Sequence, residues 1–520
     1  MNHRSAHPSL LLHTVGLTLA FCGAGMLLSS GVELVMGDAT GDWAPLLALG
    51  LLSGGAGYLI WFITTVPRRI PLLDVFATVA SAWLAMSLVG ALPYLLTGTL
   101  TDLDLALFES VSGFTTTGAT VLQAAPDDPT RYDASNGILF WRAISQWIGG
   151  MGVIALVIAV LPSVGSWGMG MMAAEAPGPT GERLTPRVRS TARHLWGVYG
   201  GFTIVVVIAY LLAGMSPFGA VTHSFTTVST GGFSPYTASI AHFDSQVIDW
   251  IVIVAMFVAG TSFPMIYRLL KGRPGPMLRS AEFRTYCAVV AVATFLIFLT
   301  ADSGARNYTG FRDSLFTVLA IVSTTGYGVV DFAGQWTDAA QAILLILMPL
   351  GAMAGSTAGG VKMIRILAVA SFAHRASLTQ LHQNLVRPVR IGSSILDDNV
   401  ANQVVGHLIL SLAAFGGGSM LIVLTGTDLV TAFSASATSF GNVGPGLGAI
   451  GSDFLAVPAF GRLVAIGNML LGRLEIYPIL LALVKLPIPR ARPTLARLSA
   501  RSARPRPAEP VAGRSGVDQP

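Results

Sequence analysis

Four short turns, each built around glycine, have a composition suited to surrounding a cation with backbone oxygen atoms. Each turn lies between long apolar segments, and the four are TTGAT at 116–120, STGGF at 229–233, TTGYG at 324–328 and NVGPG at 442–446. Four such turns meeting around one axis would present carbonyl oxygens on four sides, which is how a pore replaces the water around a dehydrating cation. The turns contain no thiolate or imidazole ligand, so they do not resemble a transition-metal site.

Glycine suits this task because it reaches backbone conformations that aim successive carbonyl groups inward. Threonine hydroxyls would fix the backbone or add an oxygen ligand. A single such turn in an apolar protein is more typical of helix packing, and only the occurrence of four in order favours a filter. The predicted filter residues are Thr116, Thr117, Gly118, Ser229, Thr230, Gly231, Thr324, Thr325, Gly326, Asn442, Val443 and Gly444, with Gly118, Gly231, Gly326 and Gly444 taken as equivalent.

The elements that must position the turns are short. About a dozen residues precede each turn, at 103–114, 218–228, 311–323 and 429–439. A stretch of that length cannot cross a bilayer and is expected to form a re-entrant half-helix. Irregular backbone at membrane depth persists only where it is buried in protein or lines a water-filled cavity. A half-helix also points its partially negative C-terminus at the cavity, which favours a cation there.

The rest of the chain predicts an all-α polytopic membrane protein. Of its 520 residues, 52% are hydrophobic and 11% are charged, against roughly 25% charged in soluble proteins. A membrane span needs about 20 apolar residues. The predicted spans are 10–30, 45–65, 73–96, 137–162, 194–214, 246–270, 284–300, 340–372 (interrupted), 402–425 and 460–485. The apolar run that starts at Leu10 is longer than a typical signal peptide core, so it is expected to stay as a span.

The charges are distributed as expected from membrane topology. Basic residues cluster at 68–69, 183–193, 268–284, 375–390 and after 485, whereas the alternating segments carry mainly acidic residues. The positive-inside rule therefore places both termini in the cytoplasm and the four turns on the outer side. The net charge of +5 is then no sign of nucleic-acid binding, and the two cysteines, Cys22 and Cys287, indicate neither a disulfide nor a metal framework.

One plan of span, short helix, turn and span recurs four times after the first two spans, with the turn glycines roughly 100 residues apart. The predicted units are an N-terminal two-span unit (1–70), pore repeats at 71–165, 166–275, 276–375 and 376–486, and a disordered cytoplasmic tail (487–520). The loop 163–192 is expected to be an ordered cytoplasmic connection. The Arg- and Pro-rich tail is expected to be solvated, with contact to anionic lipid or a partner as the alternative.

Small residues interrupt the eighth span at 351–360 (GAMAGSTAGG), directly before Lys362 and Arg365. Such a run is expected to unwind a helix facing the cavity. A small-residue packing seam is the alternative.

Several charged residues lie at or near membrane depth. Arg473 and Glu475 occur inside the last span, where charge is costly unless it faces water or a partner. Arg142 is expected either to serve the pore or to extend to the membrane interface. Glu109, Asp313 and Asp428 are expected either to attract cations to the pore mouth or to act as N-terminal helix charges.

Several motifs together resemble the Trk/Ktr/HKT superfamily of potassium uptake proteins. They are FESVSGFTTTGAT at 108–120, WRAISQWIGGMG at 141–152, HSF at 223–225, STGGFS at 229–234, AGSTAGGVKMIR at 354–365, NVGPGLG at 442–448 and GRLE at 472–475. They follow the family's order over about residues 10–485. The two extra N-terminal spans are similar to those of the bacterial Trk-type membrane subunit.

This resemblance implies a pseudo-fourfold potassium pore in the bacterial inner membrane, with glycine at every filter position favouring potassium over sodium. It also implies a homodimer bound to a cytosolic nucleotide-binding (NAD/ATP-sensing) regulatory subunit. The implied gating residues are Gly351, Gly355, Ser356, Thr357, Gly359, Gly360, Lys362 and Arg473, where Arg473 would set a barrier to cations. Ala352, Met353 and Ala358 depart from the family's glycine-richer loop.

Two other functions compete with potassium uptake. One is a sodium or poorly selective cation conductor of the same fold. The other is a membrane enzyme, which would need paired carboxylates or an activated nucleophile. The best candidate for such a site, His223, has no evident partner in the sequence. No P-loop or dinucleotide fingerprint is present, so we expect this chain to bind no cofactor, with potassium only as the transported ion.

Overall fold

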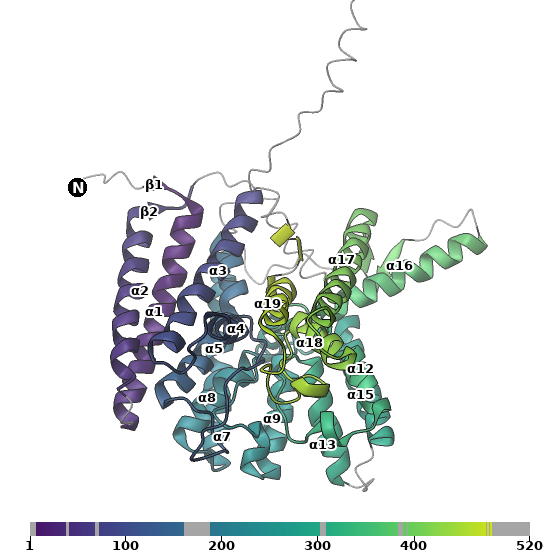
Figure 1. Ribbon diagram of the computed structural model, residues 1–520. Helices are drawn as coiled ribbons and strands as arrows, with labels where there is room; N and C mark the ends of the chain where they lie inside the picture. Colours follow the sequence, from purple (N-terminus) through teal and green to yellow (C-terminus); the bar gives the residue numbers. More distant parts are fainter. Residues whose placement is uncertain are drawn as a thin grey trace, which may run out of the picture.

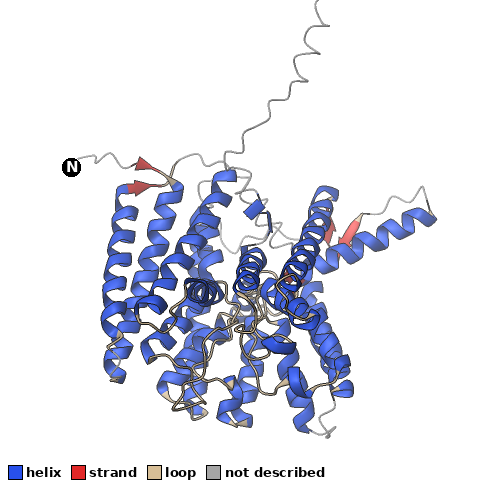
Figure 2. Cartoon of the chain, in the orientation of Figure 1, coloured by secondary structure: helices blue, strands red, loops and turns tan. Residues whose placement is uncertain are grey.

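The computed structural model describes residues 7–37, 41–67, 72–160, 188–301, 308–382, 388–392, 394–474, 476–477 and 479–480. Helices dominate this part of the chain (Figures 1 and 2). The strands form three short pairs: β1 (His7–Pro8) with β2 (Thr64–Thr65), β3 (Leu350–Gly351) with β4 (Val361–Lys362), and β5 (Val389–Ile391) with β6 (Ser394–Leu396). The predicted helical fold class is confirmed.

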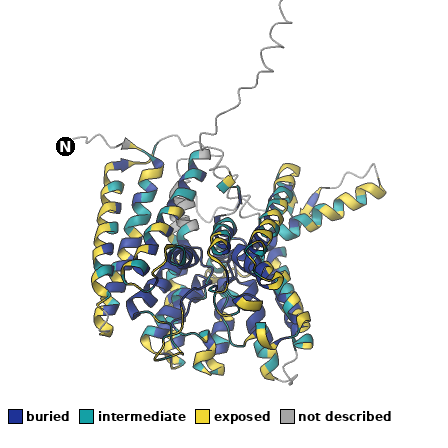
Figure 3. Ribbon diagram, viewed as in Figure 1, coloured by how far each residue is buried: buried dark blue, intermediate teal, exposed yellow. Residues whose placement is uncertain are grey.

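Six helices of the described chain are long and apolar enough to cross a membrane. They are α1 (Leu10–Met36), α2 (Trp43–Ile63), α3 (Leu72–Leu96), α7 (Val188–Leu212), α12 (Ala281–Thr300) and α17 (Asp398–Val423). Their outward faces expose large apolar side chains (Figure 3), for example Leu52 on α2 and Leu212 on α7. An apolar outer surface of this kind is suited to lipid and not to water.

The predicted span at 246–270 is broken by a sharp bend, which was not expected. The segment consists of α9 (Gln246–Ala259) and α10 (Phe263–Leu270), which are bent by 104° relative to each other. Pro264 lies in the first turn of α10 and has no backbone N–H to continue a helix from α9. Gly260 ends α9, and a Cβ atom there would lie 2.5 Å from the hydroxyl of Tyr286. The chain therefore turns sharply at 260–262.

The predicted interruption of the eighth span is confirmed. Helix α15 (Asp338–Leu347) ends before a loop, residues 348–362, and α16 (Met363–Leu381) begins after it. Helices α5 (Asn136–Val160) and α19 (Ala459–Leu474) overlap two further predicted spans, 137–162 and 460–485. Most of the predicted connection 163–192 lies outside the described residues, as does the whole tail 487–520.

Each of the four turns follows a short helix, as predicted. These helices are α4 (Leu103–Phe114), α8 (Pro217–Val228), α13 (Tyr308–Val322) and α18 (Leu429–Gly441). Helices α8 and α18 begin with side-chain caps: Ser216 Oγ accepts from Gly219 N at 3.1 Å, and Asp428 Oδ1 accepts from Thr431 N at 3.0 Å. Figure 1 shows α4 and α18 at mid-height of the long helices.

The first two helices pack tightly against each other and against the rest of the fold. A Cβ atom at Gly23 would lie 2.3 Å from the backbone nitrogen of Gly54, so α1 and α2 touch through their main chains. The buried carboxylate of Glu33 on α1 accepts a 2.5 Å hydrogen bond from Gly137 N in the first turn of α5. The N-terminal helix pair is thereby joined to the helix that follows the first turn.

Candidate functional site

The four turns share one backbone conformation. The first residue of each adopts a left-handed φ, although none is glycine: Thr116 (53°), Thr230 (55°), Thr324 (59°) and Asn442 (56°). The third residue is a glycine with positive φ: Gly118 (81°), Gly232 (76°), Gly326 (75°) and Gly444 (106°). Left-handed non-glycine residues are uncommon and are retained where the surrounding structure enforces them. We call these four segments (116–118, 230–232, 324–326 and 442–444) the ring.

The backbone hydrogen bonds show that one predicted equivalence is wrong by one residue. The second residue of each turn donates its N–H to a carbonyl oxygen five residues earlier: Thr117 to Ser112 (2.9 Å), Gly231 to Thr226 (2.7 Å), Thr325 to Ala320 (2.9 Å) and Val443 to Thr438 (3.0 Å). Gly232, and not Gly231, is therefore the counterpart of Gly118, Gly326 and Gly444. The segment offers two adjacent glycines, and counting from Thr230 in place of the first glycine would have identified the correct one.

The third-position glycines allow neighbouring turns to approach each other closely. A Cβ atom on each would strike the second-residue carbonyl oxygen of the next turn: Gly118 at 2.1 Å from Gly231, Gly232 at 1.8 Å from Thr325, Gly326 at 1.8 Å from Val443, and Gly444 at 2.7 Å from Thr117. These contacts run from each turn to the next and return from the fourth to the first. The ring is closed, and any side chain at these positions would displace a carbonyl group.

Further contacts join the fourth unit to the first. The Asn442 Nδ2 group donates to Thr117 Oγ1 at 3.0 Å, and Phe454 N donates to Thr120 O at 2.9 Å. Arg462 on α19 forms a 2.6 Å ion pair with Asp104 on α4. The two ends of the series of turns are thus fastened by polar contacts as well as by packing.

A cavity of about 540 Å³ adjoins the ring on one side. All four third-position glycines line it, whereas Gly231 does not. In the described part of the chain, no donor group reaches the carbonyl oxygens of Thr117, Thr325 or Val443. These carbonyl oxygens therefore remain available to coordinate a cation that prefers oxygen ligands, such as an alkali cation.

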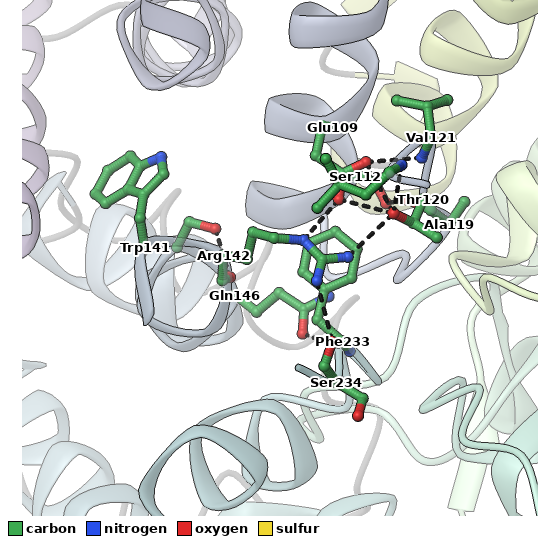
Figure 4. A network of polar contacts seen from close by, with 12 residues as sticks. Glu109, Ser112, Ala119, Thr120, Val121, Trp141, Arg142, Gln146, Phe233 and Ser234 are labelled. Atoms are coloured by element: carbon green, nitrogen blue, oxygen red, sulfur yellow. Dashed lines mark hydrogen bonds and ion pairs between the residues drawn. The ribbon is translucent and has the colours of Figure 1, made fainter. Parts of the chain in front are cut away.

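Arg142 is buried and lines the cavity beside the ring (Figure 4), so of its two expected roles, extension to the membrane interface is wrong. Its Nε lies 2.7 Å from Glu109 Oε1, and its Nη1 donates to Ser234 O at 3.0 Å. The guanidinium carbon lies 4.0 Å from the centre of the aromatic side chain of Phe233. One arginine therefore links the first short helix to the backbone that follows the second turn.

The three acidic residues considered for the pore mouth have other roles. Glu109 is fully buried and paired with Arg142, so its prediction as a mouth charge is wrong. Asp428 caps α18 by accepting from Thr431 N at 3.0 Å, and the hydrogen bonds from Thr431 hold the pKa of Asp428 below its ordinary value. Asp313 is paired with Arg312 at 2.7 Å. Each carboxylate is thus engaged in the fold.

The loop 348–362 lies against the ring. Gly359 N donates to Thr324 Oγ1 at 2.9 Å, and Thr357 Oγ1 donates to Val228 O, at the end of α8, at 3.0 Å. A Cβ atom at Gly360 would lie 3.3 Å from Gly441 O. The loop contacts three of the four units, and because its backbone is not helical, the alternative of a helical packing seam is wrong.

The two arms of the loop are pressed together. Gly351 and Lys362 pair between β3 and β4, and a Cβ atom at Gly351 would lie 1.9 Å from Gly359 O. Gly355 and Gly360 have positive φ values of 76° and 61°. Glycines are therefore required here by conformation and by close approach. The predicted loop residues Gly351, Gly355, Ser356, Thr357, Gly359, Gly360 and Lys362 lie together in this one segment.

Arg473 ties the loop to the first unit. Its Nη1 donates to Thr357 O at 2.5 Å and its Nη2 to Gly149 O on α5 at 3.1 Å. The Lys362 ammonium donates to Ala358 O within the loop. Arg473 thus lies beside the loop, as predicted, while Glu475 lies outside the described residues.

Sequence reasoning missed two further anchors of the loop. The Glu282 Oε1 atom accepts from Ala354 N at 2.6 Å. At the bend between α9 and α10, Met353 N donates to Gly260 O at 3.2 Å and Phe263 N donates to Gly355 O at 2.9 Å. A buried acidic residue at the start of an apolar helix was the available signal for Glu282.

His223 is buried, and both of its ring nitrogens lie within hydrogen-bond distance of a partner. Its Nδ1 lies 2.8 Å from Gly219 O and its Nε2 lies 3.1 Å from Ser234 Oγ. The described residues contain no group of three or more His, Cys, Asp or Glu side chains placed to hold a metal ion. The histidine supports the backbone around the second turn.

Comparisons with known proteins agree with this geometry. Residues 57–492 match the TrkH family model, described as a cation transport protein. The Trk system potassium uptake protein TrkH of Vibrio parahaemolyticus is 34% identical over 485 residues, covering 91% of this chain and 98% of the relative. The Escherichia coli K12 protein of that name is 32% identical with the same coverage.

A solved structure has the same architecture. The crystal structure of the potassium transporter TrkH from Vibrio parahaemolyticus superimposes with a TM-score of 0.80 at 32% identity, covering 93% of this chain and 99% of that one. The family model and the relatives cover most of the sequence, and the chain therefore belongs to the TrkH family of cation transport proteins, as a multi-pass membrane protein.

Proposed function

We propose that this chain is the potassium-translocating subunit of a Trk-type uptake system. The observation that carries the proposal is the closed ring, in which four second-position carbonyl groups contact four third-position glycines. Carbonyl oxygens at fixed positions replace the hydration shell of a dehydrated cation. The curated relatives named above are potassium uptake proteins, which supports potassium as the ion.

The proposed path begins at the 540 Å³ cavity and passes through the ring to the loop 348–362. In this path, the filter residues are those of the four turns: Thr116, Thr117, Gly118, Ser229, Thr230, Gly231, Gly232, Thr324, Thr325, Gly326, Asn442, Val443 and Gly444. The loop is the gate, and Arg473 places a positive charge beside it. Conduction then requires the loop to move away from Thr324 and Val228.

The chief rival is a sodium or poorly selective conductor of the same fold. Glycine occupies all four third positions, and the resemblance associates this pattern with potassium. The close contacts at the ring fix the carbonyl positions, which supports discrimination by geometry. An enzyme has less support, because the family is one of cation transport proteins and His223 is engaged in the fold.

The remaining parts of the proposal concern the cellular setting. The distribution of arginines supports insertion in the bacterial inner membrane with both termini in the cytoplasm. The phrase "Trk system" in the names of relatives supports a multicomponent assembly. We include in it a second copy of this chain and a cytosolic nucleotide-binding regulatory subunit.

The test is uptake of radioactive rubidium by cells that lack their own potassium uptake systems. The full chain, expressed with its regulatory subunit, is expected to restore uptake that excess sodium does not inhibit. Inhibition by sodium at equal concentration would favour the rival conductor. Absence of uptake by well-expressed, membrane-inserted protein would overturn the proposal.

A further inference from the structure

The second turn of the ring lacks a side chain that the other three turns have. At the second position, the first and third turns carry Thr117 and Thr325, and the fourth carries Val443. Each of the two threonine hydroxyls bonds to the hydroxyl two residues before it, Thr117 to Thr115 and Thr325 to Ser323, both at 2.8 Å. The second turn has Gly231 at this position and can make no such contact.

The side chain of Gln146 occupies the space that Gly231 leaves. A Cβ atom at Gly231 would lie 2.3 Å from Gln146 Cδ and 2.3 Å from its Oε1. Gln146 is fully buried on α5, one helical turn beyond Arg142. The amide therefore comes from a different unit of the chain and fills the position of a missing side chain.

Both ends of this amide are bonded to the second turn. Its Nε2 donates to Gly231 O at 2.7 Å, and its Oε1 accepts from Phe233 N at 3.1 Å. Figure 4 shows the side chain reaching from α5 toward Phe233. These two bonds fix the backbone on both sides of Gly232, and Gly231 O is the same oxygen that faces Gly118 in the closed ring.

We propose that Gln146 is a positioning residue that sets the cation selectivity of the ring. It orients the Gly231 carbonyl group, and its N–H shares that oxygen with the transported cation. The other three second-position carbonyl oxygens receive no donor from the described residues, and their turns have a side chain at the second position in place of this support. This inference rests on the proposed function of the ring as a filter.

The inference is tested by a double-mutant cycle between Gln146 and Gly231. Gly231 is absent from the residues with positive φ, so threonine is compatible with its backbone once the amide is removed. G231T alone places its Cβ on the Gln146 amide and is expected to lower rubidium-over-sodium selectivity by about tenfold. Q146A alone is expected to lower it by a similar factor.

The double variant Q146A/G231T is expected to regain most of the selectivity, because it recreates the Thr-Thr-Gly sequence of the first and third turns. Uptake and sodium competition are measured in cells, with the amount of membrane-inserted protein determined for each variant. Q146E serves as an isosteric second variant, since it cannot donate to Gly231 O and is expected to lose selectivity while remaining folded.

Gln341 provides a matched control. Its amide donates to two backbone carbonyl groups, Ala333 O at 2.9 Å and Trp336 O at 3.0 Å, but it lies outside the ring. Q341A is expected to leave selectivity unchanged. Wild-type selectivity in both Q146A and Q146E, or no recovery in the double variant, would overturn this inference and leave the proposed function standing. Failure of the wild-type chain to take up rubidium would instead overturn the proposed function.

Discussion

The ring and the loop 348–362 are in contact, yet they are held by different kinds of interaction. The ring depends on backbone geometry, because its third-position glycines have positive φ and leave no room for a Cβ atom. The loop is fastened largely by separate side-chain contacts from other elements, among them Thr324, Glu282 and Arg473. A single hydrogen bond contributes about 1 kcal/mol. The ring is therefore held by close backbone packing, whereas single side-chain substitutions can remove contacts of the loop.

The largest expected effect is that of a methyl group in the ring. Gly326→Ala would place a Cβ atom 1.8 Å from Val443 O at a φ of 75°. Backbone strain of about 1–3 kcal/mol at this position is expected to lower rubidium uptake by about tenfold or more. Gly417→Ala, on α17, is the control, since nothing lies within 4 Å of a Cβ atom there. Equal rubidium uptake by the two variants would show that uptake does not depend on the close packing of the ring glycines.

The next largest effect concerns the buried ion pair behind the ring. Arg142→Ala leaves the Glu109 carboxylate buried without its partner, at a cost of about 3–5 kcal/mol in the free energy of unfolding. Denaturant unfolding in detergent measures this loss. Arg375→Ala breaks a pair whose partner, Asp398, is 69% exposed, and should cost about 0–1 kcal/mol. Similar costs for both variants would contradict the assignment of the Arg142 pair to the interior.

Removal of a side chain that holds the loop should increase rubidium flux, whereas the methyl group added to the ring should decrease it. Arg473→Ala removes charge-assisted bonds to Thr357 O and Gly149 O, each worth about 1.5–3 kcal/mol. Rubidium flux into proteoliposomes without any regulatory subunit is expected to rise about tenfold, with unchanged selectivity. Arg462→Ala, on the same helix but paired with Asp104, should not raise flux. A fall in flux on Arg473→Ala would argue against the loop as a gate.

The smallest effect is expected at Glu282. Glu282→Gln keeps an oxygen that can accept from Ala354 N but loses the charge, so the contact weakens by about 1 kcal/mol. Regulator-free flux should rise by a few fold, and Glu282→Ala should exceed it. The same proteoliposome measurement distinguishes the two variants. If neither changes the flux, Glu282 supports the fold and does not hold the loop.

Sequence patterns predicted those parts of the fold that depend on the composition of one continuous segment. Hydropathy located the long helices, short apolar stretches located α4, α8, α13 and α18, and small residues located the interruption at 348–362. Position along the chain could not predict which side chains meet. Glu109 and Arg142 are 33 residues apart, and Gln146 and Gly231 are 85 apart. The choice of Gly232 over Gly231, by contrast, required only a count from Thr230 along the chain.

The ring is completed only when the first and last turns meet. Asn442 bonds to Thr117 across 325 positions, and the contact between Gly444 and Thr117 closes the series. Ribosomes deliver a chain from its N-terminus, so three turns enter the membrane before the fourth exists. A nascent or truncated chain therefore lacks one wall of the ring, and it also lacks Arg473 beside the loop. The complete ring, and the selective pathway that we propose through it, therefore require all four units of the chain.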